Sequence, residues 1–137
     1  MFLLDTNVIS ELRKNKPHGA VLAWFDTVRA EDLAIPASVI GELQAGAELT
    51  RRNHPAKAVE FERWIDRIML TYAIVPIDGD TIREWVRLMV GRSQDLSEDV
   101  MIAATARIRR FIVVTRDVRD FEGLGVEIQN PFPPAQE

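Results

Sequence analysis

Five acidic side chains stand where apolar runs end or where helices are expected to begin. Asp5 closes the first apolar run of the chain, and Asp117 and Asp120 follow the last long one. Glu42 and Asp99 each fall within about one turn of the start of a predicted helix. Because ligands of parallel sheets collect at the carboxyl ends of the strands, we expect these acids to face one crevice.

The chemistry that such a cluster supports is the binding of a hard divalent cation. Carboxylates crowded into one crevice repel one another, and oxygen ligands select Mg²⁺, with Mn²⁺ as a substitute, over Zn²⁺. The chain has no cysteine, and its two histidines, His18 and His54, lie in or beside expected loops. The residue types therefore predict a magnesium site without thiolate or imidazole ligands.

Each acid taken singly also has an ordinary structural explanation. Asp99 could compensate the dipole at a helix N-terminus, and Glu42 could be a solvated helix residue. Asp117 and Asp120 could be turn residues, and Asp5 could form an Asx turn ahead of the first helix. The metal interpretation therefore depends on the acids being brought together.

The elements that would position these acids alternate between strands and helices. Apolar runs predict strands at about residues 2–6, 33–36, 73–77, 111–115 and 126–129. Helical periodicity predicts helices at about 7–14, 18–29, 39–49, 56–71, 80–90 and 97–109, with Ser38 as the N-cap of the third. This alternation predicts an α/β fold with parallel strands, right-handed crossovers and helices on both faces of the sheet.

The composition is that of one ordinary globular domain, expected over residues 1–130 with a loose tail at 131–137. Of the 137 residues, 47% are hydrophobic and 28% are charged. No apolar run approaches the roughly 20 residues of a membrane span, and no signal peptide is evident, so a cytoplasmic location is expected. The net charge of −4 disfavours a simple polyanion-binding module. It is compatible with an enzyme whose metal ions supply the positive charge.

Four segments together resemble the PIN-domain ribonucleases, above all the VapC-type toxins of type II toxin–antitoxin pairs and their FitB-like branch. They occur in family order over nearly the whole chain, and the resemblance implies a single PIN-like domain with a five-stranded parallel sheet. The segments are Leu4-Asp5-Thr6-Asn7-Val8, Ile40-Gly41-Glu42-Leu43, Asp99-Val100-Met101-Ile102-Ala103-Ala104-Thr105-Ala106 and Val114-Thr115-Arg116-Asp117.

The resemblance also implies roles for individual residues. Asp5, Glu42, Asp99 and Asp117 match the catalytic, metal-binding acids of the family. Many relatives carry Asn at the position of Asp117, and Asp120 matches a recurrent acid that could share this fourth role. The positions that support the site by hydrogen bonding are Thr6, Asn7, Ser38 and Thr115.

The activity implied by the resemblance is magnesium-dependent hydrolysis of RNA, with inhibition by a cognate VapB-like antitoxin. A metal-bound water, whose pKa is lowered, would attack the phosphodiester phosphorus. The chain is expected to form a homodimer or a toxin–antitoxin hetero-oligomer, and residues 61–68 could serve the core, the dimer or the antitoxin. The basic residues that could guide RNA, or be ordinary surface charges, are Arg13, Lys14, Arg51, Arg52, Arg116 and Arg119.

Three alternatives remain open at this stage. A related nuclease could act on DNA or on structured nucleic acid. A phosphoacceptor receiver domain would need an acidic neighbour for Asp5 and a late lysine, but no lysine follows Lys57. A dinucleotide-binding unit would need a glycine-rich turn after the first strand, which the sequence lacks.

Overall fold

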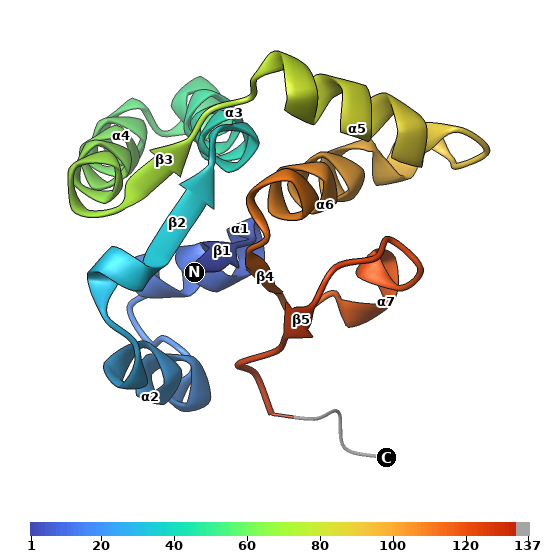
Figure 1. Cartoon of the computed structure of the whole chain (residues 1–137). Coiled ribbons are helices and arrows are strands. Elements are labelled where there is room, and N and C mark those ends of the chain that lie inside the picture. The colour runs from blue at the N-terminus through green and yellow to red at the C-terminus, as the bar shows by residue number, and fades with distance from the viewer. Residues whose placement is uncertain (134–137) are drawn as a thin grey trace.

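A computed structural model describes residues 1–133, and its centre is one parallel sheet of five short strands (Figure 1). The order across the sheet is β3-β2-β1-β4-β5. Pairing of β1 with both β2 and β4 puts the strand that precedes Asp5 in the middle of the sheet. The predicted five-stranded parallel sheet is confirmed. The strands are β1 (Phe2–Leu4), β2 (Leu33–Pro36), β3 (Ala73–Val75), β4 (Ile112–Val114) and β5 (Ile128–Gln129).

Helices make the connections between the strands. The chain runs outward from β1 to β3 and then returns past β1 to β4, so right-handed crossovers place helices on both faces of the sheet. Within residues 1–133, no helix combines the length and apolar character that crossing a bilayer requires. The helices are α1 (Thr6–Ile9), η1 (Ser10–Arg13), α2 (Gly19–Thr27), η2 (Ala30–Asp32), α3 (Ala37–Asn53), α4 (Pro55–Thr71), α5 (Gly79–Met89), η3 (Gln94–Leu96), α6 (Ser97–Arg109) and α7 (Val118–Phe121).

The core lies between the sheet and the inward faces of the long helices. Leu3, Leu4 and Val113 have no exposed surface. On α6 the alanines at 103, 104 and 106 are buried, and their small side chains let the helix lie close to its neighbours. The apolar stripe of α4, residues 61–68, is also part of this core, which decides among the roles left open for it.

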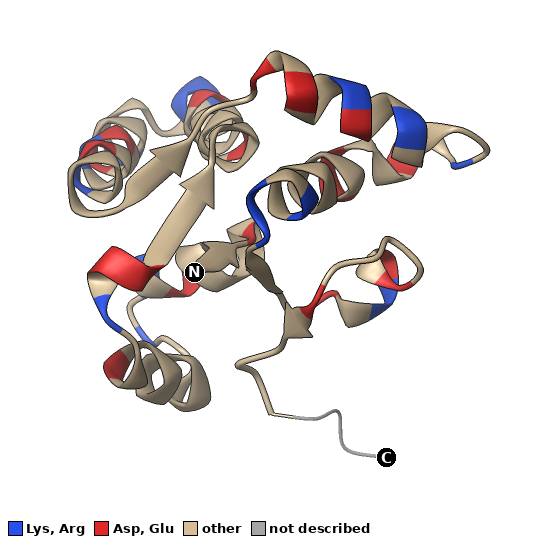
Figure 2. Ribbon diagram, in the orientation of Figure 1, with Lys and Arg blue, Asp and Glu red and all other residues tan. Residues whose placement is uncertain are grey.

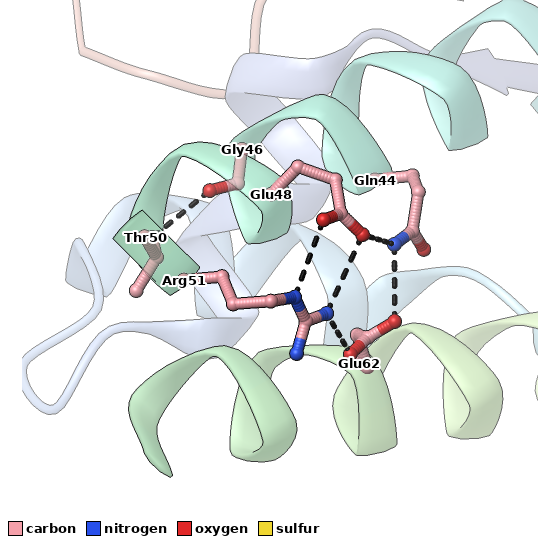
Figure 3. Close-up of polar contacts among 6 residues, drawn as sticks. All are labelled: Gln44, Gly46, Glu48, Thr50, Arg51 and Glu62. Atoms are coloured by element: carbon pink, nitrogen blue, oxygen red, sulfur yellow. Dashed lines mark hydrogen bonds and ion pairs between the residues drawn. The ribbon is translucent and has the colours of Figure 1, made fainter. Parts of the chain in front are cut away.

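A polar network joins α3 to α4 on the outside of this core (Figure 3). The Arg51 guanidinium donates to Glu48 Oε2 at 3.2 Å and also pairs with Glu62. Gln44 Nε2 donates to both carboxylates, at 3.0 Å and 3.1 Å. Two acids within the fold therefore engage the Arg51 side chain, which favours the ordinary surface-charge role left open for it over guidance of a polyanion.

The boundaries of α3 differ from the prediction at both ends. The helix begins at Ala37 after Pro36 and has no side-chain cap, so the prediction of Ser38 as N-cap is wrong. Ser38 lies inside the first turn because Pro36 already holds the extended conformation of an N-cap residue. The helix continues to Asn53, and the cations in its last turn favour this extension by opposing the helix dipole.

The beginning of the C-terminal tail packs onto the domain, so the prediction of a loose tail is wrong for Pro131 and Phe132. Phe132 is 6% exposed. Its ring meets His18 edge-on at 5.8 Å between centroids and lies 3.9 Å below the Arg116 guanidinium carbon. An aromatic side chain gains from such burial, and the domain boundary expected at residue 130 omits this contact. The rest of the predicted tail, 134–137, lies outside the described residues.

We predict that Phe132→Ala lowers the free energy of unfolding by about 3 kcal/mol, because it removes a buried ring and leaves a cavity. Urea denaturation followed by circular dichroism measures the change. Pro133→Ala, at the neighbouring exposed position, is the control. Equal stability of the two variants would show that Phe132 does not contribute to the core.

Candidate functional site

Asp5 sits at the carboxyl end of β1 and anchors the site. Its backbone N–H donates to the Val114 carbonyl at 3.0 Å, which extends the pairing of β1 with β4. The side chain is only 4% exposed. One carboxylate oxygen accepts from the Thr6 N–H and the other from the Thr115 hydroxyl, both at 2.7 Å. These two bonds fix both oxygens of a buried carboxylate at the sheet edge.

Asn7 and Thr115 hold the loop after β4 against the first helix. Asn7 Nδ2 donates to Asp117 Oδ2 at 3.0 Å, and Asn7 Oδ1 accepts from the Arg116 N–H at 3.1 Å. The Thr115 hydroxyl accepts from the Asp117 N–H at 2.9 Å while it donates to Asp5. The amide of one residue and the hydroxyl of another therefore set the position of Asp117 relative to Asp5.

Glu42 reaches the site from the first turns of α3. Its Oε2 accepts from the Thr6 hydroxyl at 2.9 Å, so Thr6 links this carboxylate to Asp5. Ser38 lies one turn earlier on the same helix. Its Oγ is buried and has no hydrogen-bond partner among residues 1–133, which leaves this hydroxyl unpaired one helical turn before Glu42.

Asp99, in the first turn of α6, experiences the strongest electrostatic effect in the site. The pKa of Asp99 is raised from the ordinary value of 3.8 to about 7, and burial is the largest cause. The negative charges of Asp5, Asp120 and Asp117 supply the next part of this rise, followed by hydrogen-bonding contact with Asp120. Asp5, Asp117 and Asp120 therefore lie near enough to Asp99 to oppose its ionisation.

The pKa values of two other acids of the cluster are also raised. Burial raises the pKa of Asp5 despite the hydrogen bonds that favour its charged form. Burial also raises the pKa of Glu42, and the charges of Glu98 and Asp5 add to that effect. Glu98, for which the sequence suggests no use, thus lies close to the site.

The donor set fits a hard divalent cation. Every ionisable group in the cluster is a carboxylic acid, whereas His18 caps α2 and meets Phe132 edge-on. In residues 1–133 no three acidic or histidine side chains already converge as one metal-binding group. The Asp5 and Glu42 carboxylates instead accept hydrogen bonds from Thr6 and Thr115. A bound cation would compete with these hydroxyls and would relieve the repulsion that raises the pKa of Asp99.

The structure brings together all the acids singled out by the sequence: Asp5, Glu42, Asp99, Asp117 and Asp120. Thr6, Asn7 and Thr115 contact them as expected of supporting residues. The basic residues are more dispersed. The Arg116 guanidinium lies over Phe132, the exposed Arg119 side chain belongs to α7, and Arg13 and Lys14 lie in and just after η1.

Comparison with known proteins identifies the family. The PIN domain family model matches residues 2–126. The chain belongs to the PIN-domain family. The domain is 36% identical to the VapC ribonuclease Y4jK of Sinorhizobium fredii, over 98% of this chain and 100% of that protein. It is 33% identical to the toxin FitB of Neisseria gonorrhoeae, over 96% of this chain and 99% of that protein.

Solved structures agree with this placement of the PIN domain. The crystal structure of FitAcB from Neisseria gonorrhoeae has a TM-score of 0.83 at 33% identity, covering 96% of this chain and 98% of that one. A structure of FitAB bound to a DNA fragment has a TM-score of 0.84 at 28% identity, covering 99% of both chains. The chain is therefore a VapC-type PIN domain related to FitB, and the receiver-domain and dinucleotide-binding alternatives are wrong.

The raised pKa of Asp99 predicts how stability depends on pH. Between its unfolded value of 3.8 and about 7, the folded protein holds a proton that the unfolded chain releases. The free energy of unfolding should therefore fall as pH rises through this window, and the loss is complete above about pH 7. Asp99→Asn removes this ionisation. At about pH 8 it should be more stable than the wild type by on the order of 1–2 kcal/mol after screening.

Urea denaturation in EDTA at about pH 4 and about pH 8 measures this difference. At the lower pH the gap should shrink, since Asp99 is then largely protonated and resembles Asn. Asp66→Asn, at an exposed position of α4, provides the control and should show no pH-dependent gain. A constant difference across the pH range would contradict the electrostatic origin.

Proposed function

We propose that this PIN domain is a divalent-metal-dependent endoribonuclease that acts as the toxin of a toxin–antitoxin pair. The observation that carries the proposal is that Asp5, Glu42, Asp99 and the two acids after β4 lie within electrostatic range of one another at one edge of the sheet. The similarity to the VapC ribonuclease and to toxin FitB supports the reaction class and the biological role. RNA as the substrate agrees with the cytoplasmic location expected from the sequence.

Asp5, Asp99 and Glu42 would hold Mg²⁺, with Mn²⁺ as a substitute, and Asp117 and Asp120 would share the fourth position. When bound, the metal would lower the pKa of a water that attacks phosphorus and would neutralise charge developing on the phosphoryl oxygens. Thr115 and Thr6 orient Asp5, and Asn7 orients Asp117. Ser38 would supply a further oxygen. The carboxylates and their hydrogen-bond partners are therefore the catalytic apparatus that we assign.

The side chains of Arg13, Lys14, Arg116 and Arg119 would guide the RNA backbone toward this acidic edge. Arg116 is the best placed, because its own N–H is fixed by Asn7 and its guanidinium is stacked on Phe132. The ring holds the guanidinium in place without forming an ion pair with it. It retains its donors for phosphate oxygens.

The partners we propose are a VapB-like antitoxin and a second copy of the chain. FitAcB and FitAB are the complexes named for the two structural relatives. An apolar stripe along α5 and its C-cap supports self-association, since Ile82 and Val86 on the helix and Val90 just after it are all exposed. In Figure 2, the ribbon of α5 carries both acidic and basic residues.

We predict that Asp5→Asn and Asp99→Asn each lower RNA cleavage by at least about 100-fold, because each removes a charged ligand from the metal. Cleavage of a mixed-sequence RNA by purified protein measures the effect. EDTA should abolish the activity, and Mg²⁺ or Mn²⁺ should restore it. Asp66→Asn is the control for charge removed away from the site. Full activity in both site variants would refute the assignment.

Thr115→Val tests the positioning of Asp5 at nearly constant side-chain shape. The substitution deletes the hydroxyl that donates to Asp5 and accepts from Asp117. We expect cleavage to fall by about 10- to 100-fold with weaker activation by Mg²⁺, as for other partners of metal ligands. Thr115→Ser should retain most of the activity. If valine and serine behave alike, the hydroxyl does not position the site.

A DNA-directed nuclease is the second candidate within the same chemistry. The acids alone would serve either nucleic acid. Parallel assays on RNA and DNA oligonucleotides of the same sequence separate the two, and we expect cleavage of the RNA.

A further inference from the structure

A pocket of about 610 Å³ opens between η1 and α4, away from the acidic cluster. Basic side chains line much of this pocket, and two aromatic side chains line it as well. We infer that this pocket binds phosphate groups of the single-stranded RNA substrate beside the segment held at the acids. The side chains that carry this argument are Arg13, Lys14, Lys57, Arg67, Phe61 and Trp64.

The charge of the pocket is opposite to that of the whole chain. Four cationic residues line it, against a single acid, Glu60, although the net charge of the protein is −4. Lys14 pairs with Glu11. Among residues 1–133, no carboxylate lies within ion-pair distance of Arg13, Lys57 or Arg67. A polyanion would meet three cations that the fold itself does not neutralise.

The arrangement of Arg13 favours phosphate over a diffuse counterion. Its guanidinium carbon lies 3.6 Å from the centre of the Phe61 ring. Stacking holds the planar group in place and leaves its in-plane N–H donors available, a geometry suited to phosphate oxygens. Phe61 and Trp64 are 7% and 8% exposed, so the rings form an apolar floor beneath the charged rim.

The chain path ties this pocket to the acidic cluster. Arg13 follows Asp5 by eight residues, all within α1 and η1. At the rise of these helices the separation is about 12–16 Å, a span that a few nucleotides of extended RNA would cover. The inference rests on the proposed ribonuclease function, and it assigns a positive subsite to a reaction whose acidic centre repels its own substrate.

The test compares two double variants of equal net charge. Lys57→Gln/Arg67→Gln removes two pocket cations, whereas Arg63→Gln/Arg83→Gln removes two exposed cations of α4 and α5 that do not line the pocket. Both are made in the Asp5→Asn protein to suppress cleavage. Fluorescence anisotropy of a short fluorescein-labelled single-stranded RNA is then measured over a series of salt concentrations.

We expect the pocket variant to bind about 10-fold more weakly than the Asp5→Asn parent at moderate salt. The slope of log K against log salt should fall by about 1.4, because each lost phosphate contact removes about 0.7. The control variant should stay within about twofold of the parent. Equal affinities and slopes for the two variants would overturn the inference. The inference would also be overturned if the pocket variant bound RNA normally but no longer bound an acidic segment of a partner protein.

A cleavage assay separates this inference from the proposed function. For this assay both pairs of substitutions are made in the otherwise wild-type protein. If the wild type cleaves RNA with Mg²⁺ and the two double variants show the same KM, the subsite is wrong and the ribonuclease assignment stands. If the wild type does not cleave RNA but only the pocket variant loses RNA affinity, the ribonuclease assignment is wrong and the subsite stands.

Discussion

The hydrogen bond from the Thr115 hydroxyl to Asp5 is the contact on which the site depends. It joins the ends of β1 and β4, which are neighbours only because the sheet has the order 3-2-1-4-5. It satisfies a buried carboxylate that would otherwise be costly in an apolar surrounding. The same hydroxyl accepts from the Asp117 N–H. One oxygen atom therefore sets the spacing of two acids more than 100 residues apart in the chain.

The fold of this PIN domain holds carboxylates close together at one edge of the sheet although their negative charges repel one another. Burial and neighbouring carboxylates raise the pKa of Asp99 to about 7, and Asp5 and Glu42 are shifted in the same direction. Such a cluster costs stability at neutral pH. A fold keeps this arrangement where the repulsion can be relieved by a ligand, and the hard oxygen donors point to a divalent cation as that ligand.

Aromatic rings keep two of the guanidinium groups apart from the acids. Arg13 lies over Phe61 and Arg116 lies over Phe132. A guanidinium stacked on a ring keeps its N–H donors available for a ligand. The Arg51 guanidinium, in contrast, is paired with Glu48 and Glu62. This division would let a protein of negative net charge offer cations to the proposed RNA substrate while its acidic cluster stays open to the proposed cation.

The sequence by itself indicated the five strands, the long helices, the parallel sheet and the acids proposed for the site, because apolar periodicity is local and these acids fall at or near element ends. It did not determine how these acids are held. The bonds of Asn7 and Thr115 to partners about 110 positions away exist only once β1 and β4 pair. The burial of Phe132 and the pocket between η1 and α4 were likewise decided by tertiary structure. A tail aromatic and exposed helical cations look ordinary in sequence, and their contacts arise from packing between segments that no local pattern relates.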